Sequence, residues 1–180
     1  ASIKPQNFTV PNMSIPVPTA PPLNMLKVEA VANGANAIIA GSALLLQTIS
    51  AALAAINVDR KVSIGLNNHL KQDLIEPEYF CLMGKFTELP LVIAAGEADR
   101  IVAAQSEGEA SGAVGIVAYK VKNTGLRLVI LYSVPFDQVS YENWFKLSLI
   151  SDTVAINKAL YDDMYYNQGV LTPGTVVAGK

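Results

Sequence analysis

Residues 113–134 read AVGIVAYKVKNTGLRLVILYSV, and they set the fold class. Residues 113–121 and 126–134 are rich in Val, Ile and Tyr, side chains that fit a pleated sheet, so both runs are typical of strands. The residues between them, KNTG, end in a glycine and match a tight turn between antiparallel strands. This stretch therefore predicts a β-hairpin and a mainly β protein.

Shorter β-rich runs lie on both sides of the hairpin. The sequence predicts further strands over residues 61–66, 90–94, 101–104 and 144–151. Residues 153–166 are predicted to be helical, because Tyr161, Met164 and Tyr165 recur on adjoining turns. Several short strands with one late helix favour a β-sandwich flanked by two α-helices, of which the second is the tyrosine-rich one. Residues 59–180 are assigned to this sandwich.

The chain before the sandwich carries a long uncharged segment. No residue between Glu29 and Asp59 is charged. This length is about 43 Å if wholly helical, whereas the hydrocarbon core of a bilayer is about 30 Å thick. Small and polar residues recur in it at helical steps of three and four: Asn33, Asn36, Ala40, Ala43, Gln47, Ser50, Ala54 and Asn57. We expect an amphipathic helix over residues 23–58 that detaches and inserts into a membrane. A buried core helix and a permanent membrane anchor are the alternatives.

Residues 1–22 form a third region, an arm rich in proline without a helical period. Proline confines such a chain to extended, loop or edge-strand conformations. A disordered tail and an ordered arm that adds to a sheet edge fit this pattern equally well.

The composition narrows the function classes. Among the 180 residues Cys81 is the one cysteine and His69 the one histidine. These counts exclude an intramolecular disulfide and leave little from which to build a metal site or a nucleophile with its base. The net charge of -2 gives no basic stripe for nucleic acid. We expect a protein that is not an enzyme and that uses no cofactor and no metal.

Four blocks of sequence together resemble the actinoporin family. They are residues 60–68 (RKVSIGLNN), 110–119 (ASGAVGIVAY), 132–144 (YSVPFDQVSYENW) and 160–166 (LYDDMYY), in the family's order and with comparable gaps. The resemblance implies a secreted, water-soluble protein that binds phosphocholine lipids, forms homo-oligomers and threads its N-terminal helices through the target cell membrane. The function expected is that of a pore-forming cytolysin. A non-lytic binding or structural assembly protein with the same fold is the alternative.

The resemblance also assigns residues to a lipid site. Proteins hold a quaternary ammonium against aromatic faces, and a hydroxyl can donate to the phosphate. The headgroup-binding residues implied are Ser133, Pro135, Tyr141, Tyr161, Tyr165 and Tyr166. The residues at the membrane interface, which aromatic side chains prefer, are Phe136, Trp144 and Phe145. On spacing alone, tyrosines that merely pack the helix onto the sheet are the alternative. The pore-lining residues expected on the N-terminal helix are Glu29, Asn33, Asn36, Gln47, Ser50 and Asn57.

The sequence departs from the family pattern in several places. Residues 138–140 (QVS) occupy part of a loop that is usually rich in aromatic residues, and Glu109 and Leu70 stand where the family has an apolar residue and a serine. The candidate pore stripe is almost neutral, so we expect weak ion selectivity. The chain ends soon after Tyr166, where relatives continue through two more strands. We expect the tail to pair poorly and to leave an open sheet edge, which the proline-rich arm would cover.

Overall fold

The computed structural model describes the backbone of residues 26–32, 51–167 and 176–179, and the side chains of residues 51–166. The proline-rich arm over residues 1–22 lies outside the described residues. So do four of the expected pore-lining residues: Asn33, Asn36, Gln47 and Ser50.

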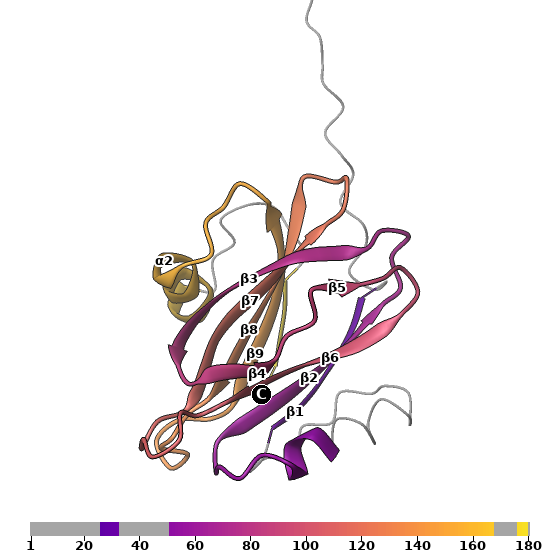
Figure 1. Ribbon diagram of the computed structural model, residues 1–180. Coiled ribbons are helices and arrows are strands. Elements are labelled where there is room, and N and C mark those ends of the chain that lie inside the picture. The colour runs from indigo at the N-terminus through magenta and orange to yellow at the C-terminus, as the bar shows by residue number, and fades with distance from the viewer. Residues whose placement is uncertain (1–25, 33–50, 168–175, 180) are drawn as a thin grey trace, which may run out of the picture.

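Two antiparallel sheets form a β-sandwich, as the sequence predicts (Figure 1). The first sheet has the order β1 (Leu26–Ala32), β2 (Lys61–Asn68), β6 (Ala98–Ala104) and β4 (Lys85–Glu88). The second has the order β10 (Val176–Gly179), β9 (Trp144–Ser151), β8 (Leu126–Val134), β7 (Ala113–Val121), β3 (Leu74–Met83) and β5 (Val92–Ile93).

The central hairpin confirms the local prediction to the residue. Strands β7 and β8 pair from Ala113 opposite Val134 to Val121 opposite Leu126. The turn needs left-handed backbone at Asn123 (φ 62°) and Gly125 (φ 68°), which asparagine and glycine adopt at low cost. Because the turn chemistry and the strand propensity agree, the sequence alone places this element.

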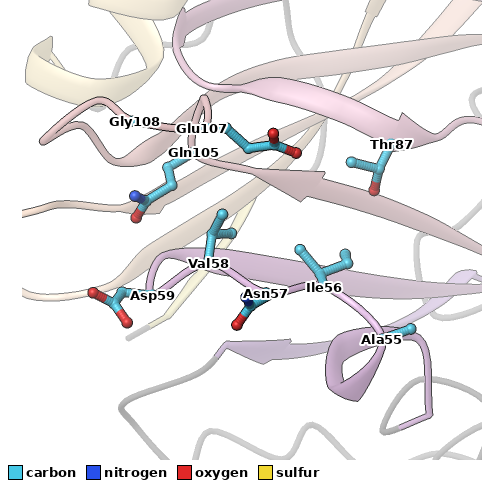
Figure 2. A pocket seen from close by; sticks show the side chains of 9 residues that line it. All are labelled: Ala55, Ile56, Asn57, Val58, Asp59, Thr87, Gln105, Glu107 and Gly108. Carbon is cyan, nitrogen blue, oxygen red and sulfur yellow. The ribbon is translucent and has the colours of Figure 1, made fainter.

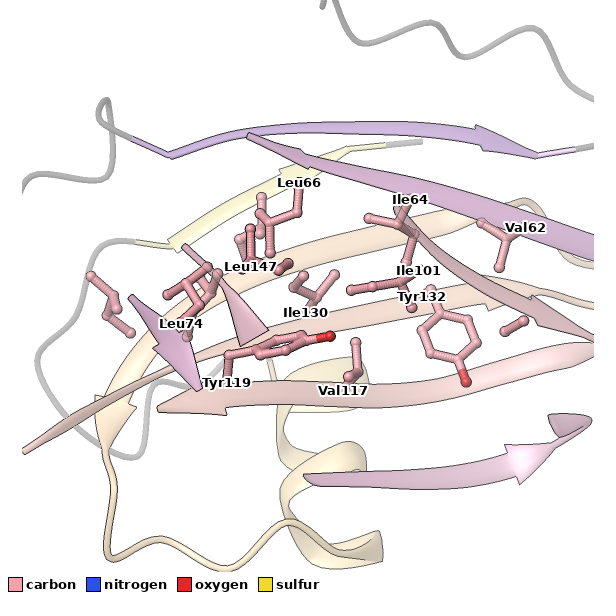
Figure 3. Close-up of a cluster of buried hydrophobic side chains, with 14 of the residues drawn as sticks. Val62, Ile64, Leu66, Leu74, Ile101, Val117, Tyr119, Ile130, Tyr132 and Leu147 are labelled. Atoms are coloured by element: carbon pink, nitrogen blue, oxygen red, sulfur yellow. The ribbon is translucent and has the colours of Figure 1, made fainter. Parts of the chain in front are cut away.

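The hydrophobic core lies between the two sheets (Figure 3). Alternate residues of β7, such as Val117 and Tyr119, face this core, while Ile116 and Ala118 face the opposite side of the six-stranded sheet. Tyr119 is fully buried, and its hydroxyl donates to the carbonyl oxygen of Pro90 at 2.8 Å. Both faces of the six-stranded sheet are therefore apolar at its centre.

A short helical segment covers the outer face of the six-stranded sheet (Figure 1). It consists of α2 (Lys158–Asp162) followed directly by a π-helical turn, η2 (Asp163–Asn167). The helix predicted over residues 153–166 is thus too long at its start, because the Asn157 side chain accepts from the Leu160 amide and caps the helix there. Leu160, Tyr161 and Met164 pack on the sheet.

The N-terminal part of the helix predicted over residues 23–58 is wrong. Residues 26–32 form strand β1 and pair with β2, so Glu29 lies opposite Gly65 in a sheet and is not on a pore helix. Helical geometry is found at residues 51–54 and has ended before Asn57. The sequence 26–32 (LKVEAVA) also alternates, and the ladder with β2 is a long-range contact that local helix propensity does not register.

Other strands differ from their predictions in extent. Strand β5 is shorter than the run 90–94, and β6 begins three residues before 101. Strands β3 and β4 were not predicted, and β3 departs from simple alternation because its pairing with β7 contains two register shifts. The expectation that the C-terminal tail pairs poorly is wrong, since β10 pairs with β9 from Val176 to Gly179.

Candidate membrane-binding site

A row of four side chains crosses one end of the six-stranded sheet on its outer face. Met83 lies opposite Val114, Val114 opposite Ser133, and Ser133 opposite Trp144. Directly opposed residues of antiparallel strands point to the same face, and Val114 belongs to the cluster under the helix. Ser133 and Val114 are buried, whereas Met83 is 45% exposed. The row is therefore an apolar floor with one hydroxyl, bounded by a methionine and a tryptophan.

Three tyrosines stand on the same outer face. Tyr161 is only 2% exposed and packs against Phe80, with ring centroids 6.3 Å apart. Tyr165 stacks on Tyr161 at 5.6 Å with 19° between the ring planes, and Tyr166 meets Tyr165 edge-on at 4.9 Å. Tyr166 is 70% exposed. The tyrosine cluster (Tyr161, Tyr165 and Tyr166) thus runs from the buried sheet surface out to solvent.

The loop over residues 135–143 joins β8 to β9 and is called the apolar loop here, because several of its exposed side chains are apolar. The Asp137 carboxylate accepts from the backbone amides of Val139 and Ser140 at 2.9 and 3.1 Å, so the turn is fixed from within. A hydrogen bond with the Ser140 side chain contributes most to holding the pKa of Asp137 below its ordinary value, and the two backbone bonds add to this effect. Val139 is fully exposed, and Phe136 and Tyr141 are exposed as well. The loop presents apolar groups to solvent on a fixed turn.

Arg60 joins this loop to the start of the sandwich. Its guanidinium Nε and Nη2 donate to the carbonyl oxygen of Phe136 at 3.1 and 3.0 Å, and its Cζ lies 5.6 Å from the Phe136 ring centroid. The backbone of Arg60 is itself fixed by two bonds with Gln105. Gly112 allows the loop to start close to the sheet, because an added Cβ would stand 2.6 Å from the carbonyl oxygen of Val134.

The structure brings together some of the predicted residues and separates others. Ser133, Trp144, Tyr165 and Tyr166 share the outer face, and Tyr141 lies in the adjoining loop with Pro135 and Phe136. Tyr161 is buried. It therefore fits the alternative, a tyrosine that packs the helix onto the sheet, better than it fits contact with a headgroup. Phe145 packs against the core between the sheets.

Sequence reasoning missed three residues of this region. Met83 and Val114 complete the row beside Ser133. The place of Met83 depends on the register of β3, which two irregularities shift, whereas Val114 opposite Ser133 follows from the hairpin of β7 and β8. Lys146 on β9 is buried on the outer face. The sequence contains a sign of this burial. Lys146 is two residues from Trp144 in a strand, so both side chains point to the same face of the sheet, which is the face that the helical segment covers.

A cavity of about 680 Å³ lies elsewhere, where the chain enters the sandwich (Figure 2). It is lined by Ala55, Ile56, Asn57, Val58, Asp59, Thr87, Gln105, Glu107 and Gly108. Asn57, one of the expected pore-lining residues, thus belongs to the junction between the N-terminal segment and the sandwich. Lys61 holds this junction, because its Nζ donates to the carbonyl oxygen of Ile56 at 2.6 Å.

Within residues 26–32, 51–167 and 176–179, no helix has the length and apolarity needed to cross a bilayer. The same part of the chain holds no group of three or more His, Cys, Asp or Glu side chains placed to bind a metal. The features found are those of a β-sandwich with an aromatic surface site at one end of its outer face.

Comparison with known proteins identifies the family. Residues 33–176 match the family described as sea anemone cytotoxic protein. The chain is 33% identical over 145 residues to DELTA-alicitoxin-Pse1b of Phyllodiscus semoni, covering 78% of this chain and 63% of the relative. It is 33% identical over 136 residues to deep sea actinoporin Cjtox II of Cribrinopsis japonica, covering 74% and 61%. The chain belongs to the sea anemone cytotoxic protein family, which includes actinoporins.

Two further comparisons set the limits of the match. DELTA-stichotoxin-Hcr4a of Radianthus crispa is 32% identical over 136 residues, covering 74% of this chain and 77% of the relative. The chain thus spans less than two thirds of the length of the first two relatives and more of the third. The solved structure of the lipid binding protein Nakanori aligns with 54% of this chain at 14% identity and a TM-score of 0.42, a likeness too slight to bear on function.

Proposed function

We propose that this protein is a pore-forming cytolysin that is secreted, binds phosphocholine headgroups on a target membrane, assembles with further copies and inserts its N-terminal segment. The observation that carries the proposal is the tyrosine cluster on the same outer face as Ser133 and Trp144, together with a loop of exposed apolar side chains at the end of β8. Family membership supports it, since the relatives are named as toxins and actinoporins.

The chemistry of the site suits a choline headgroup better than a metal or a small polar metabolite. Tyr165 and Tyr166 meet edge-on, so their rings lie at a steep angle, and the largely exposed ring of Tyr166 is open to a quaternary ammonium. Ser133 supplies one hydroxyl on the floor of the row, and Trp144 stands next to it. Phe136 and Val139 in the loop would enter the apolar boundary of the bilayer while the tyrosines meet its headgroups.

Insertion is assigned to the uncharged segment, with its boundaries revised. Strand β1 removes residues 26–32 from the proposed helix, and Glu29 with them. Asn33, Asn36, Gln47 and Ser50 remain the proposed water-facing residues. A lumen lined by amides and hydroxyls has no fixed charge to select ions, so the pore is expected to discriminate weakly between cations and anions.

The decisive experiment compares binding and leakage on vesicles of phosphatidylcholine with and without sphingomyelin. The variant Tyr165→Ala/Tyr166→Ala should bind about fivefold to thirtyfold more weakly, the effect of about 1–2 kcal/mol of cation–π contact. Tyr79→Ala is the matched control, because Tyr79 is exposed on β3 and outside the tyrosine cluster. Equal binding of the folded double variant and the wild type would remove the headgroup assignment.

A non-lytic binding protein is the second candidate. The loop residue Val139 is fully exposed where an aromatic residue would anchor more strongly, and this observation favours weaker membrane contact. The same vesicles distinguish the two functions. Leakage of an encapsulated dye on binding supports the cytolysin, and binding without leakage supports the alternative.

A further inference from the structure

Lys146 is a buried cation on the outer face of the six-stranded sheet. It lies in β9, opposite Leu131 of β8, and is 6% exposed. Leu131, which it faces, belongs to the cluster under the helical segment, and so does Ile116 opposite Leu131 on β7. An ammonium group taken out of water costs free energy unless it is well hydrogen-bonded. An apolar residue would fill the same volume at lower cost, so the contact made by the ammonium group must account for the lysine.

The ammonium group of Lys146 ends at the π turn that carries the tyrosines. Its Nζ donates to the carbonyl oxygen of Met164 at 3.0 Å, in a buried bond between residues 18 apart in the chain. Burial lowers the pKa of Lys146, and the negative charge of Asp163 on the same turn opposes that shift. The lysine thus links β9 to two consecutive residues of η2.

The bonded carbonyl directly precedes Tyr165. The last carbonyl groups of a helix have no partner further along the helix and take one from elsewhere. Here the peptide group between Met164 and Tyr165 takes its partner from β9. The direction of that peptide sets the direction in which Tyr165 and Tyr166 leave the turn. A π turn inside a helix is a conformation that surrounding contacts must maintain, and such turns are frequent at functional sites.

We propose that Lys146 is a positioning residue, which fixes the π turn and so sets the angle between Tyr165 and Tyr166 at which the pair receives a quaternary ammonium. The proposal rests on the proposed headgroup function but concerns a residue that does not touch the lipid. The row across β3, β7, β8 and β9 supplies the floor of the site, and Lys146 holds the tyrosines above it in place.

The test compares Lys146→Met with Ser148→Ala, a control on the same buried face of β9. Each folded variant is measured for binding to sphingomyelin–phosphatidylcholine vesicles, for tyrosine circular dichroism in the near ultraviolet and for urea unfolding. Lys146→Met should lose much of the tyrosine signal and bind about fivefold more weakly, the loss of about one aromatic contact. Ser148→Ala should change neither, whatever it does to stability.

Two further arms identify the cause. In the Tyr165→Ala/Tyr166→Ala background, Lys146→Met should weaken binding no further, because the lysine acts through those rings. If Lys146→Met does not fold, Lys146→Arg and Lys146→Gln replace it; arginine should keep the tyrosine signal and the binding, and glutamine should lose both.

Unchanged tyrosine signal and binding in Lys146→Met, or in Lys146→Gln where that variant replaces it, would overturn the proposal. A further loss of binding when Lys146→Met is added to the Tyr165→Ala/Tyr166→Ala variant would overturn it as well. If the wild type binds no choline vesicles, the headgroup function fails, and the tyrosine signal alone still decides whether Lys146 orders the turn.

Discussion

Tyr161 and Tyr166 stand five residues apart on one helical segment and have opposite surroundings. Tyr161 is packed between Phe80 and Tyr165 on the sheet, whereas Tyr166 extends into solvent. Replacing Tyr161 with alanine should lower the free energy of unfolding by about 3–5 kcal/mol, the usual cost of emptying a buried aromatic site. Tyr166→Ala should change it by less than about 0.5 kcal/mol. Urea unfolding measures both. A small loss for Tyr161→Ala would show that this ring does not anchor the helical segment.

Asp137 organises the apolar loop through its own backbone bonds. Asp137→Ala should leave global stability almost unchanged and weaken vesicle binding, because Val139 and Tyr141 lose their fixed turn. The pKa of Asp137 is lowered, so its contribution to the turn is present above the ordinary value near 3.8 and is lost as the pH falls through the folded-state pKa. Asp162→Ala is the control, since that carboxylate pairs with Lys158 on the helix surface. Vesicle binding that is the same for all three proteins at neutral pH contradicts this role.

At the scale of elements, Arg60 connects the apolar loop with the segment that leads into β2. Arg60→Ala should lower stability by about 1 kcal/mol, the net value of a hydrogen bond, and should speed amide hydrogen exchange in residues 136–141. Arg60→Lys should recover only part of this, because lysine lacks the planar pair of donors that meets the Phe136 carbonyl oxygen. Lys85→Ala, at an exposed position on β4, serves as the control. Unaltered exchange in Arg60→Ala would mean that the loop is ordered without the arginine.

The elements differ in how far the sequence predicts them. The hairpin of β7 and β8 was predicted with its true ends because its propensities and turn residues are local. Strand β1 was predicted as helix because its partner β2 is far along the chain and Ala and Leu favour helices in isolation. The tyrosine helix was placed correctly but started too early, since the Asn157 cap was not recognised.

For the candidate site, the sequence indicates which residues to consider better than it indicates how their side chains are arranged. The residues of the tyrosine cluster followed from the family resemblance, and their ring contacts place them together. Which ring would be covered could not follow, because the π turn changes the face that each residue presents. Lys146 and Met83 depend on strand register across the sheet, which a single sequence does not determine.

For the molecule as a whole, the buried tyrosines predict a loss of stability in alkali. Burial raises the pKa of Tyr119, Tyr132 and Tyr161 above the ordinary value of 10. A raised folded-state pKa gives stability that is complete below pH 10 and declines as the pH rises toward the folded-state values. Urea midpoints should therefore begin to fall near pH 10, roughly where unfolded tyrosine ionises, and should go on falling as the pH rises further. Tyr132→Phe should soften the decline, and an equal decline in that variant would exclude Tyr132 as a source.

Strand β1 allows membrane binding and insertion to be separated. Lys27 lies opposite Asn67 in the β1–β2 ladder, so the pair Lys27→Cys/Asn67→Cys in a Cys81→Ser background can join the two strands covalently. The oxidised protein should bind vesicles normally and release little dye, and reduction should restore release. Full release by the oxidised protein would show that insertion does not require β1 to leave the sheet.

The position of β1 has a topological consequence. Along the chain, the uncharged residues 33–50 run between β1 and the helical residues 51–54, and the chain then enters β2, the strand that pairs with β1. Both ends of this segment are held by paired strands of one sheet, so the segment is a closed loop and has no free end. The segment between β1 and β2, residues 33–60, would extend about 42 Å as a helix, whereas two crossings of a bilayer core need about 60 Å. A loop of that length cannot cross the bilayer twice as a helix. Insertion would therefore first have to separate β1 from β2, because the hydrogen bonds of this ladder keep the loop closed.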